Sequence, residues 1–246
     1  MWNNHSAMTV AAEAAAKEEK KTQLILSAAL ELFAERGFHG TSIPLVLGRA
    51  GVGASSLYRR FESKEALVNA VFRDAKRRLA AALHEGLDAG LPPRALFGEF
   101  WARLASFARR EPVAFRFLEL QDHAPYLDAE SRAVELAALG PIYLTCLDLQ
   151  RRGALRDDLP AGALIAFAWG AFVGLFKAER THHLPVTDAA LDAARDACWR
   201  AFAGEGDRRK EPTDGDDLRH DRGGRPGCGP GARPRHARRK RRLRAR

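Results

Sequence analysis

The chain has 246 residues, of which 46% are hydrophobic and 29% charged, and its formal net charge is +9 at pH 7. This length accommodates a small domain and a second one of ordinary size. No apolar run reaches the ~18–20 residues of a membrane span, and the first 21 residues lack the layout of a secretory signal. Three widely spaced cysteines without a CxxC pair argue against a disulfide framework or a zinc module and indicate structural thiols in a reducing cytoplasm; they are Cys146, Cys198 and Cys228.

The positive charge is unevenly distributed along the chain. Residues 204–246 contain 15 Lys/Arg against 7 Asp/Glu and therefore carry +8. Residues 17–78 carry +5, and residues 79–203 carry −3. A basic segment joined to an acidic one is what a DNA contact at one end of a protein requires, because neutralisation of phosphates supplies most nonspecific affinity.

Residues 1–21 are rich in Ala, Glu and Lys but have no clear apolar stripe. These residues form helices readily, yet they offer no face to bury, so we predict a flexible arm that continues into a first helix. Lys17, Lys20 and Lys21 could touch DNA, as N-terminal arms sometimes do. The sequence favours the alternative, a solvated arm.

Residues 41–67 show the pattern of two short amphipathic helices around a tight turn at Gly51. Ile43 and Val46 are three residues apart before the turn, and Leu57 and Phe61 are i,i+4 neighbours after it. Glycine suits the turn because it adopts positive φ without strain. The pattern predicts a helix-turn-helix, the arrangement by which many proteins present a helix to DNA.

The ends of these helices also carry recognisable signals. Thr41 is expected to cap the first helix, which places Pro44 in the first turn, where a missing N–H costs little. Ser63 is expected to cap the helix that follows, with Lys64 in its first turn, where the N-terminus is a good site for phosphate.

The second short helix has distinct faces at 100° per residue. If Leu57 and Phe61 point inward, Ser55 and Arg59 point outward. Hydroxyls and a phenol can donate to phosphate, and arginine can bind guanine through two hydrogen bonds. From the residues alone, a helical hairpin with a solvated basic face remains the alternative. The polar side chains of the outer face and its flanks are Ser55, Ser56, Tyr58, Arg59 and Arg60.

Residues from about 24 to 72 resemble the DNA-binding domain of the TetR family of bacterial transcription regulators. The resemblance rests on ILSAALELFAERGFHGTSI and AGVGASSLYRRFESKEALV, which carry E-R-G-F, T-S, A-G-V and L-Y-x-x-F-x-S-K-E-x-L. It implies a three-helix DNA-binding head over residues 22–68. At the matching positions it implies phosphate contacts from Thr41 and Lys64, and a recognition helix that presents Ser55, Ser56, Tyr58, Arg59 and Arg60.

Residues 69–203 show helical periodicity and no sustained strand alternation. The expected helices cover residues 63–85, 93–110, 112–118, 129–152, 160–182 and 187–202, with a bend at Gly140-Pro141. The predicted fold class is therefore all-α, a three-helix head on a larger helical body. The resemblance implies that the last two helices form a four-helix interface with a second copy, and that the middle helices enclose a ligand.

The aromatic residues of the body have two interpretations, a plain core or the lining of a ligand cavity. Core packing is the safer interpretation for any single residue. Catalytic motifs are missing, and no metal site or cofactor is predicted. His123 is better explained as a hydrogen-bonded connector histidine than as a ligand to a metal or a polar molecule. The residues that we select as candidate pocket lining are Phe97, Trp101, Phe115, Leu118, Tyr126, Tyr143 and Phe172.

Residues 204–246 are dominated by Gly, Pro, Arg and Asp and end in RHARRKRRLRAR, a composition typical of disorder. This basic tail either adds nonspecific DNA affinity or has little function. The sequence as a whole predicts a homodimeric, ligand-responsive repressor that a small apolar or amphipathic effector releases from a palindromic operator. A nonspecific nucleic-acid-binding protein acting through the tail is the alternative.

Overall fold

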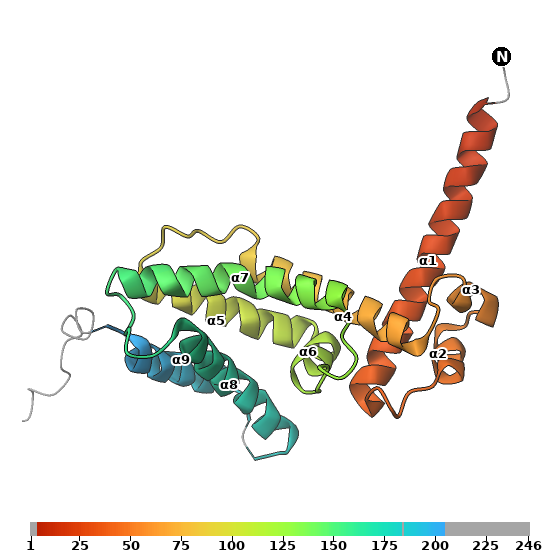
Figure 1. Cartoon of the computed structure of the whole chain (residues 1–246). Helices are drawn as coiled ribbons and strands as arrows, with labels where there is room; N and C mark the ends of the chain where they lie inside the picture. Colours follow the sequence, from red (N-terminus) through yellow and green to blue (C-terminus); the bar gives the residue numbers. More distant parts are fainter. Residues whose placement is uncertain (1–3, 184, 205–246) are drawn as a thin grey trace, which may run out of the picture. The chain divides into compact units, whose positions relative to one another are not determined.

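The computed structural model describes residues 4–183 and 185–204. These residues form helices and no strand, apart from one isolated bridge between Leu155 and Ala203, which confirms the predicted all-α class for the described part of the chain. In chain order (Figure 1) the helices are α1 (Asn4–Arg36), α2 (Ile43–Ala50), α3 (Ala54–Tyr58), α4 (Lys64–His84), α5 (Pro93–Arg110), α6 (Pro112–Glu119), α7 (Ala129–Arg151), α8 (Ala161–Arg180) and α9 (Asp188–Phe202).

The helix-turn-helix predicted from residues 41–67 is present as α2 and α3, which lie beside α1 (Figure 1). Pro44 lies in the first turn of α2, and the helix ends at Gly51, whose φ of 65° is the left-handed conformation that favours glycine. Val46 and Leu57 are completely buried in a core that includes Phe33 of α1. Helices this short are marginal alone, so this shared core holds them.

The caps agree with the predictions at one helix and differ at the other. The Ser63 side chain accepts a hydrogen bond from the N–H of Ala66 at 3.1 Å and so caps α4, as expected. The expectation that Thr41 caps α2 is wrong. The N-cap of α2 is Ser42, whose side chain makes no capping hydrogen bond. Thr41 lies one residue earlier, and its side chain is buried.

The first helix is longer than the sequence indicated. We expected a flexible arm over residues 1–21, but α1 runs without a break from Asn4 to Arg36, so the described part of that arm is helical. The predicted boundary at residue 21 therefore lies inside a helix. An amphipathic stripe was not needed there, because Ala, Glu and Lys sustain a helix by propensity once its C-terminal half is packed.

Helix α4 belongs to both halves of the molecule. Its first turns bury Leu67 and Val68 in the core that contains α1, and later turns pack against α5, α6 and α7. Its 21 residues span about 32 Å at the usual rise. One continuous element therefore connects the DNA-binding head to the helical body.

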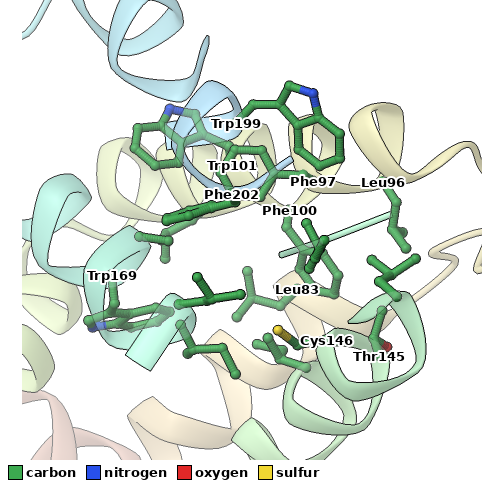
Figure 2. Close-up of a pocket in the computed structure, with 17 residues that line it drawn as sticks. Leu83, Leu96, Phe97, Phe100, Trp101, Thr145, Cys146, Trp169, Trp199 and Phe202 are labelled. Carbon is green, nitrogen blue, oxygen red and sulfur yellow. The ribbon is translucent and has the colours of Figure 1, made fainter. Parts of the chain in front are cut away.

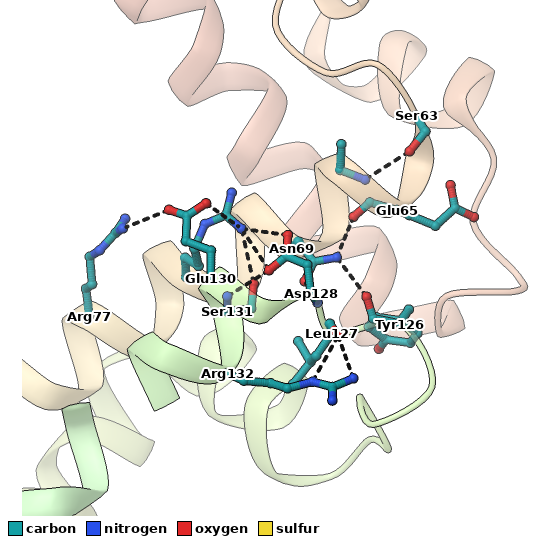
Figure 3. Close-up of polar contacts among 12 residues, drawn as sticks. Ser63, Glu65, Asn69, Arg77, Tyr126, Leu127, Asp128, Glu130, Ser131 and Arg132 are labelled. Carbon is teal, nitrogen blue, oxygen red and sulfur yellow. Dashed lines mark hydrogen bonds and ion pairs between the residues drawn. The ribbon is translucent and has the colours of Figure 1, made fainter. Parts of the chain in front are cut away.

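A polar network joins α4 to the start of α7 (Figure 3). The buried Asn69 amide donates to the carbonyl of Tyr126 at 2.8 Å and accepts from the N–H of Asp128 at 2.9 Å. Asp128 in turn caps α7 and binds Arg73 of α4 at 3.0 Å. The Asn69 amide thus holds the connector between α6 and α7 against α4, through one hydrogen bond to Tyr126 and one from Asp128.

The body helices begin where the sequence places proline or a capping side chain. Pro93 and Pro112 open α5 and α6, and the Thr187 hydroxyl caps α9 by accepting from Ala190 at 3.2 Å. Pro141 lies inside α7, which continues as one helix from residue 129 to 151. The predicted body of six helices is confirmed as α4 to α9 within the described residues.

Helix α8 is the most apolar helix of the described chain. Its best 18-residue window has a mean hydropathy of 1.6, so its length and composition alone would allow it to cross a membrane. Only 22% of that window is buried. Phe167 is 58% exposed, and Gly170 and Gly174 have open space around them. The helix packs on one side and leaves an apolar side bare.

Candidate DNA-binding surface and ligand cavity

The outer face of α3 and the two residues after it present polar side chains together. Ser55, Arg59 and Arg60 are exposed, and Tyr58 is 58% exposed, whereas Leu57 points into the core. These donors suit phosphates and guanine edges. Ser56 was expected on a flank of this face, but it is only 8% exposed because it lies beside Leu57 on the inner side of the helix. Its side chain is therefore removed from the candidate surface.

Both arginines after α3 are paired with carboxylates of α1. An Nη2 atom of Arg59 lies 3.4 Å from Oε2 of Glu18, and that of Arg60 lies 3.6 Å from Oε2 of Glu19. A hydrogen bond from Lys21, with further attraction from Arg59, lowers the pKa of the Glu18 carboxyl. The ion pairs are exposed, so they are weak and easily exchanged. Both guanidinium groups are therefore accessible to another anion.

Thr41 and Lys64 have internal roles that the sequence did not indicate. The Thr41 hydroxyl is buried and donates to the carbonyls of Gly37 and Leu32, at 2.9 and 3.1 Å. The Lys64 ammonium donates to the carbonyls of Phe38 and Thr41, at 3.0 and 3.1 Å. The Thr41 hydroxyl is buried, so its assignment as a phosphate contact is corrected. Lys64 is only half-buried, and its phosphate contact stays a prediction. These residues fix the loop between α1 and α2.

The body contains a cavity of about 130 Å³ between α4, α5, α7, α8 and α9. Figure 2 shows aromatic rings from α5, α8 and α9 around it, including Trp101, Trp169 and Trp199. None of the described residues that line this cavity is charged. The lining residues are Leu83, Leu96, Phe97, Phe100, Trp101, Leu104, Ile142, Thr145, Cys146, Leu149, Leu155, Leu164, Ile165, Ala168, Trp169, Trp199 and Phe202.

Two of the seven pocket candidates, Phe97 and Trp101, line this cavity, and their ligand role stays a prediction. Phe115 and Leu118 are buried in the core instead, on a side of α6 that faces neighbouring helices. Phe172 is completely buried and packs edge-on against Trp101, with ring centroids 5.2 Å apart.

Two tyrosines were also assigned to the pocket wrongly. Tyr143 is 45% exposed on the outer side of α7. Tyr126 stacks on Phe38 in the connector, at a centroid distance of 4.7 Å. Trp169 and Trp199 line the cavity but were not among the candidates, because periodicity does not separate lining residues from core residues.

His123 is a hydrogen-bonded connector histidine, as expected. Its Nδ1 lies 2.5 Å from the Tyr126 hydroxyl, and its Nε2 lies 2.5 Å from the carbonyl oxygen of Phe117. Burial lowers the pKa of His123 and raises the pKa of Tyr126 to about 12. The neutral ring therefore donates from Nε2 and accepts the tyrosine proton at Nδ1. Among the described residues, no group of three or more His, Cys, Asp or Glu is placed to hold a metal.

A buried polar cluster lies behind one wall of the cavity. The Trp169 indole N–H donates to Oε2 of Glu119 at 2.6 Å, and Oε1 of Glu119 lies 3.7 Å from the ammonium of Lys76. The side chains of Lys76 and Glu119 are only 5% and 8% exposed. Burial raises the pKa of Glu119 against the opposing effect of Lys76. Glu135 of α7 is the second carboxylate near Lys76, at 3.4 Å.

Comparison with known proteins finds the same family over head and body. The family described as bacterial regulatory proteins of the tetR family matches residues 25–71, and the tetracyclin repressor-like C-terminal domain matches residues 72–203. The HTH-type transcriptional regulator RutR of Escherichia coli is 41% identical over 86 residues, 35% of this chain and 35% of RutR. The chain thus spans about a third of the length of the curated relatives it matches.

Solved structures extend the likeness to the whole helical body. A TetR family regulator from Marinobacter aquaeolei VT8 is 22% identical, with a TM-score of 0.69 over 76% of this chain and 98% of that one. Another from Shewanella sp. PV-4 is 26% identical, with a TM-score of 0.65 over 74% and 98% of the two chains. The shared fold includes both the helix-turn-helix and the helices that enclose the cavity.

Proposed function

This chain belongs to the TetR family of DNA-binding transcription regulators, and from that premise we propose that it is a homodimeric repressor that a small apolar effector releases from a palindromic operator. Regulators of this family are not enzymes, in agreement with the sequence-based expectation. The observation that carries the proposal is the exposed group of Ser55, Tyr58, Arg59 and Arg60 at α3, on a head whose α4 continues into the body.

The apolar outer side of α8 supports the proposed homodimer. Phe167 is exposed there, and Gly170 and Gly174 leave room for another helix to approach closely. On α9, Ala189, Ala193 and Ala197 are also exposed at four-residue spacing, so small residues mark one side of that helix as well. Two copies of these helices can bury the bare sides in a four-helix interface. The dimer would place two heads in successive major grooves about 34 Å apart.

The cavity supports a response to an effector. Leu83 of α4 lines the cavity, and the first turns of the same helix pack in the core of the head. A ligand that binds better to one arrangement of α4 than to another shifts the population of DNA-competent dimers. The apolar lining favours an apolar or amphipathic molecule. A reducing cytoplasm is the proposed location, because Cys146 and Cys198 are buried free thiols.

In-vitro selection of bound duplexes from a random pool tests this function. We expect an enriched inverted repeat with half-sites separated by about one helical turn, and sedimentation of the complex as two chains per duplex. A pool without enrichment would overturn the proposal in favour of the alternative, nonspecific binding through residues 204–246, which lie outside the described residues except for Gly204. Removal of that tail would then abolish binding.

A further inference from the structure

The cavity wall restricts the charge of any occupant. In the part of the chain that the structure describes, the lining residues carry no charged side chain and few polar groups. The Cys146 thiol already donates to the carbonyl of Ala161 at 3.8 Å. The Thr145 hydroxyl and the indole N–H of Trp101, which is buried without a hydrogen-bond partner, are further polar groups of the lining residues. An ionised ligand would lose its hydration here without a counter-charge, which is very costly. An uncharged molecule is therefore selected.

The size of the cavity restricts the occupant further. Its volume of about 130 Å³ is close to the ~150 Å³ of an apolar protein cavity that holds one benzene ring. The faces and edges of Phe97, Trp169 and Trp199 offer the stacked and edge-on contacts that aromatic rings prefer. A molecule with a single ring can therefore be held in this space, which is partly open to solvent.

One wall residue connects the cavity to α4 by polar contacts. Trp169 lines the cavity, yet its N–H is bonded at 2.6 Å to Glu119 at the end of α6. The other oxygen of Glu119 has no hydrogen bond and only the 3.7 Å ion pair with Lys76 of α4. The buried carboxylate is thus shared between the cavity wall and α4. Loss of the indole N–H leaves Glu119 dependent on Lys76 alone.

We propose that the cavity takes an uncharged single-ring apolar molecule, and that this occupant turns the Trp169 indole away from Glu119, so that Glu119 closes on Lys76 and shifts α4. Trp169 and Glu119 act as positioning residues between the occupant and Lys76, in addition to Leu83 of α4, which lines the cavity directly. The inference rests on the proposed function for its effect on DNA, but the movement of Trp169 does not.

Toluene is the test probe, with benzoate and benzylammonium as its charged counterparts. We expect toluene to raise the melting temperature of the full-length protein, and the two ions to leave it unchanged at equal concentration. In ¹⁵N-labelled protein, the indole N–H signal that Trp169→Phe removes should move upfield with toluene, as a lost hydrogen bond requires. Absence of stabilisation by toluene, or an unmoved signal, would overturn the inference whether or not the protein selects an operator.

DNA binding supplies the second readout. Saturating toluene should weaken binding of the wild type to its selected duplex at least fivefold, the lower end of typical allosteric coupling. Trp169→Phe should bind toluene but lose this response, while Tyr143→Phe, at an exposed aromatic residue of α7 outside the cavity lining, should keep it. Glu119→Gln preserves an acceptor for the indole but not the charge opposite Lys76, so the indole signal should still move and the DNA response should disappear. An unchanged response in both Trp169→Phe and Glu119→Gln would contradict the route through Lys76.

Discussion

The ion pairs beside α3 and the ion pair beneath the cavity differ in their access to water. Arg59 and Glu18 have side chains that are 59% and 32% exposed, whereas those of Lys76 and Glu119 are 5% and 8% exposed. Exposed pairs in water are worth ~0–1 kcal/mol and exchange readily with phosphate. A buried pair is shielded from ions in solution, so it is broken when one of its two side chains moves or is replaced. The first kind suits competition with DNA, and the second suits transmission inside the protein.

Breaking the buried pair should have the largest effect. Lys76→Met leaves a buried carboxylate without its cation, which we expect to lower the free energy of unfolding by about 3–5 kcal/mol. Urea unfolding at pH 8 measures this change. Lys76→Met/Glu119→Gln is the control, since removing both charges should recover most of the loss. Equal stability of Lys76→Met and the wild type would show that the pair is not buried.

The pH dependence of the same variant has a definite sign. Because burial raises the pKa of Glu119, the folded state holds that proton more tightly than the unfolded state. Its contribution to stability is present below the ordinary Glu pKa and is lost as the pH rises through the raised value. Lys76→Met removes the opposing cation, so its stability should fall more steeply with pH than that of the wild type. Urea unfolding of both proteins at several pH values should show a difference in the free energy of unfolding that grows as the pH rises. A difference that does not change with pH would contradict this cause.

Removing an arginine of the exposed surface should affect DNA binding without affecting folding. Arg60→Ala should weaken binding to the selected duplex by about 1–3 kcal/mol and relax preference at one base position. Fluorescence anisotropy titration measures the affinity. Arg152→Ala, an equal charge change at the end of α7, should bind like the wild type. Equal losses of DNA affinity in both variants would show that Arg60 acts only through the overall charge of the protein.

Lys64 should behave as a structural residue rather than a phosphate ligand. Lys64→Met removes the donor to the carbonyls of Phe38 and Thr41 and the cation 4.1 Å from the Phe38 ring. We expect a loss of about 1–2 kcal/mol in stability, seen by thermal unfolding. The dependence of DNA affinity on salt should keep its slope. A slope reduced by about one, with stability intact, would restore the phosphate contact.

The smallest effect is expected when Arg59 and Arg60, which follow α3, lose their carboxylate partners. Glu18→Gln/Glu19→Gln removes the carboxylates that compete with DNA, so affinity should rise about twofold to fivefold at low salt, in keeping with the energy of exposed pairs. The gain should shrink as salt is added. Glu13→Gln on the same helix is the charge control. A gain from Glu13→Gln as large as that from the double variant would contradict direct competition.

Local signals in the sequence predicted most of the helices and the outer face of α3. Pro93, Pro112 and Thr187 mark helix starts because their chemistry acts within one turn. The spacing of Leu57 and Phe61 was enough to direct Ser55 and Arg59 outward. These features depend on neighbours along the chain.

Features that depend on distant residues were predicted less well. The hydrogen bonds of Lys64 were not predicted, because nothing local indicates that the carbonyl of Phe38, 26 residues away, lies 3.0 Å from its ammonium. The cavity requires five helices to converge, so Trp169 and Trp199 could not be distinguished from core residues by periodicity. Phe172 fits the same pattern and is core. The pairing of Glu18 with Arg59 likewise depended on a helix that the sequence assigned to a flexible arm.

In the proposed regulator, the residues at α3 read bases while the dimeric body sets the distance between two heads. In-vitro selection with wild-type protein and with Arg59→Ala and Arg60→Ala tests it in one measurement. We predict that the variants select inverted repeats of unchanged spacing, each with relaxed preference at the base pairs that the missing guanidinium contacts. Identical sequences from all three proteins would contradict the claim, because the bases would then be read by another surface.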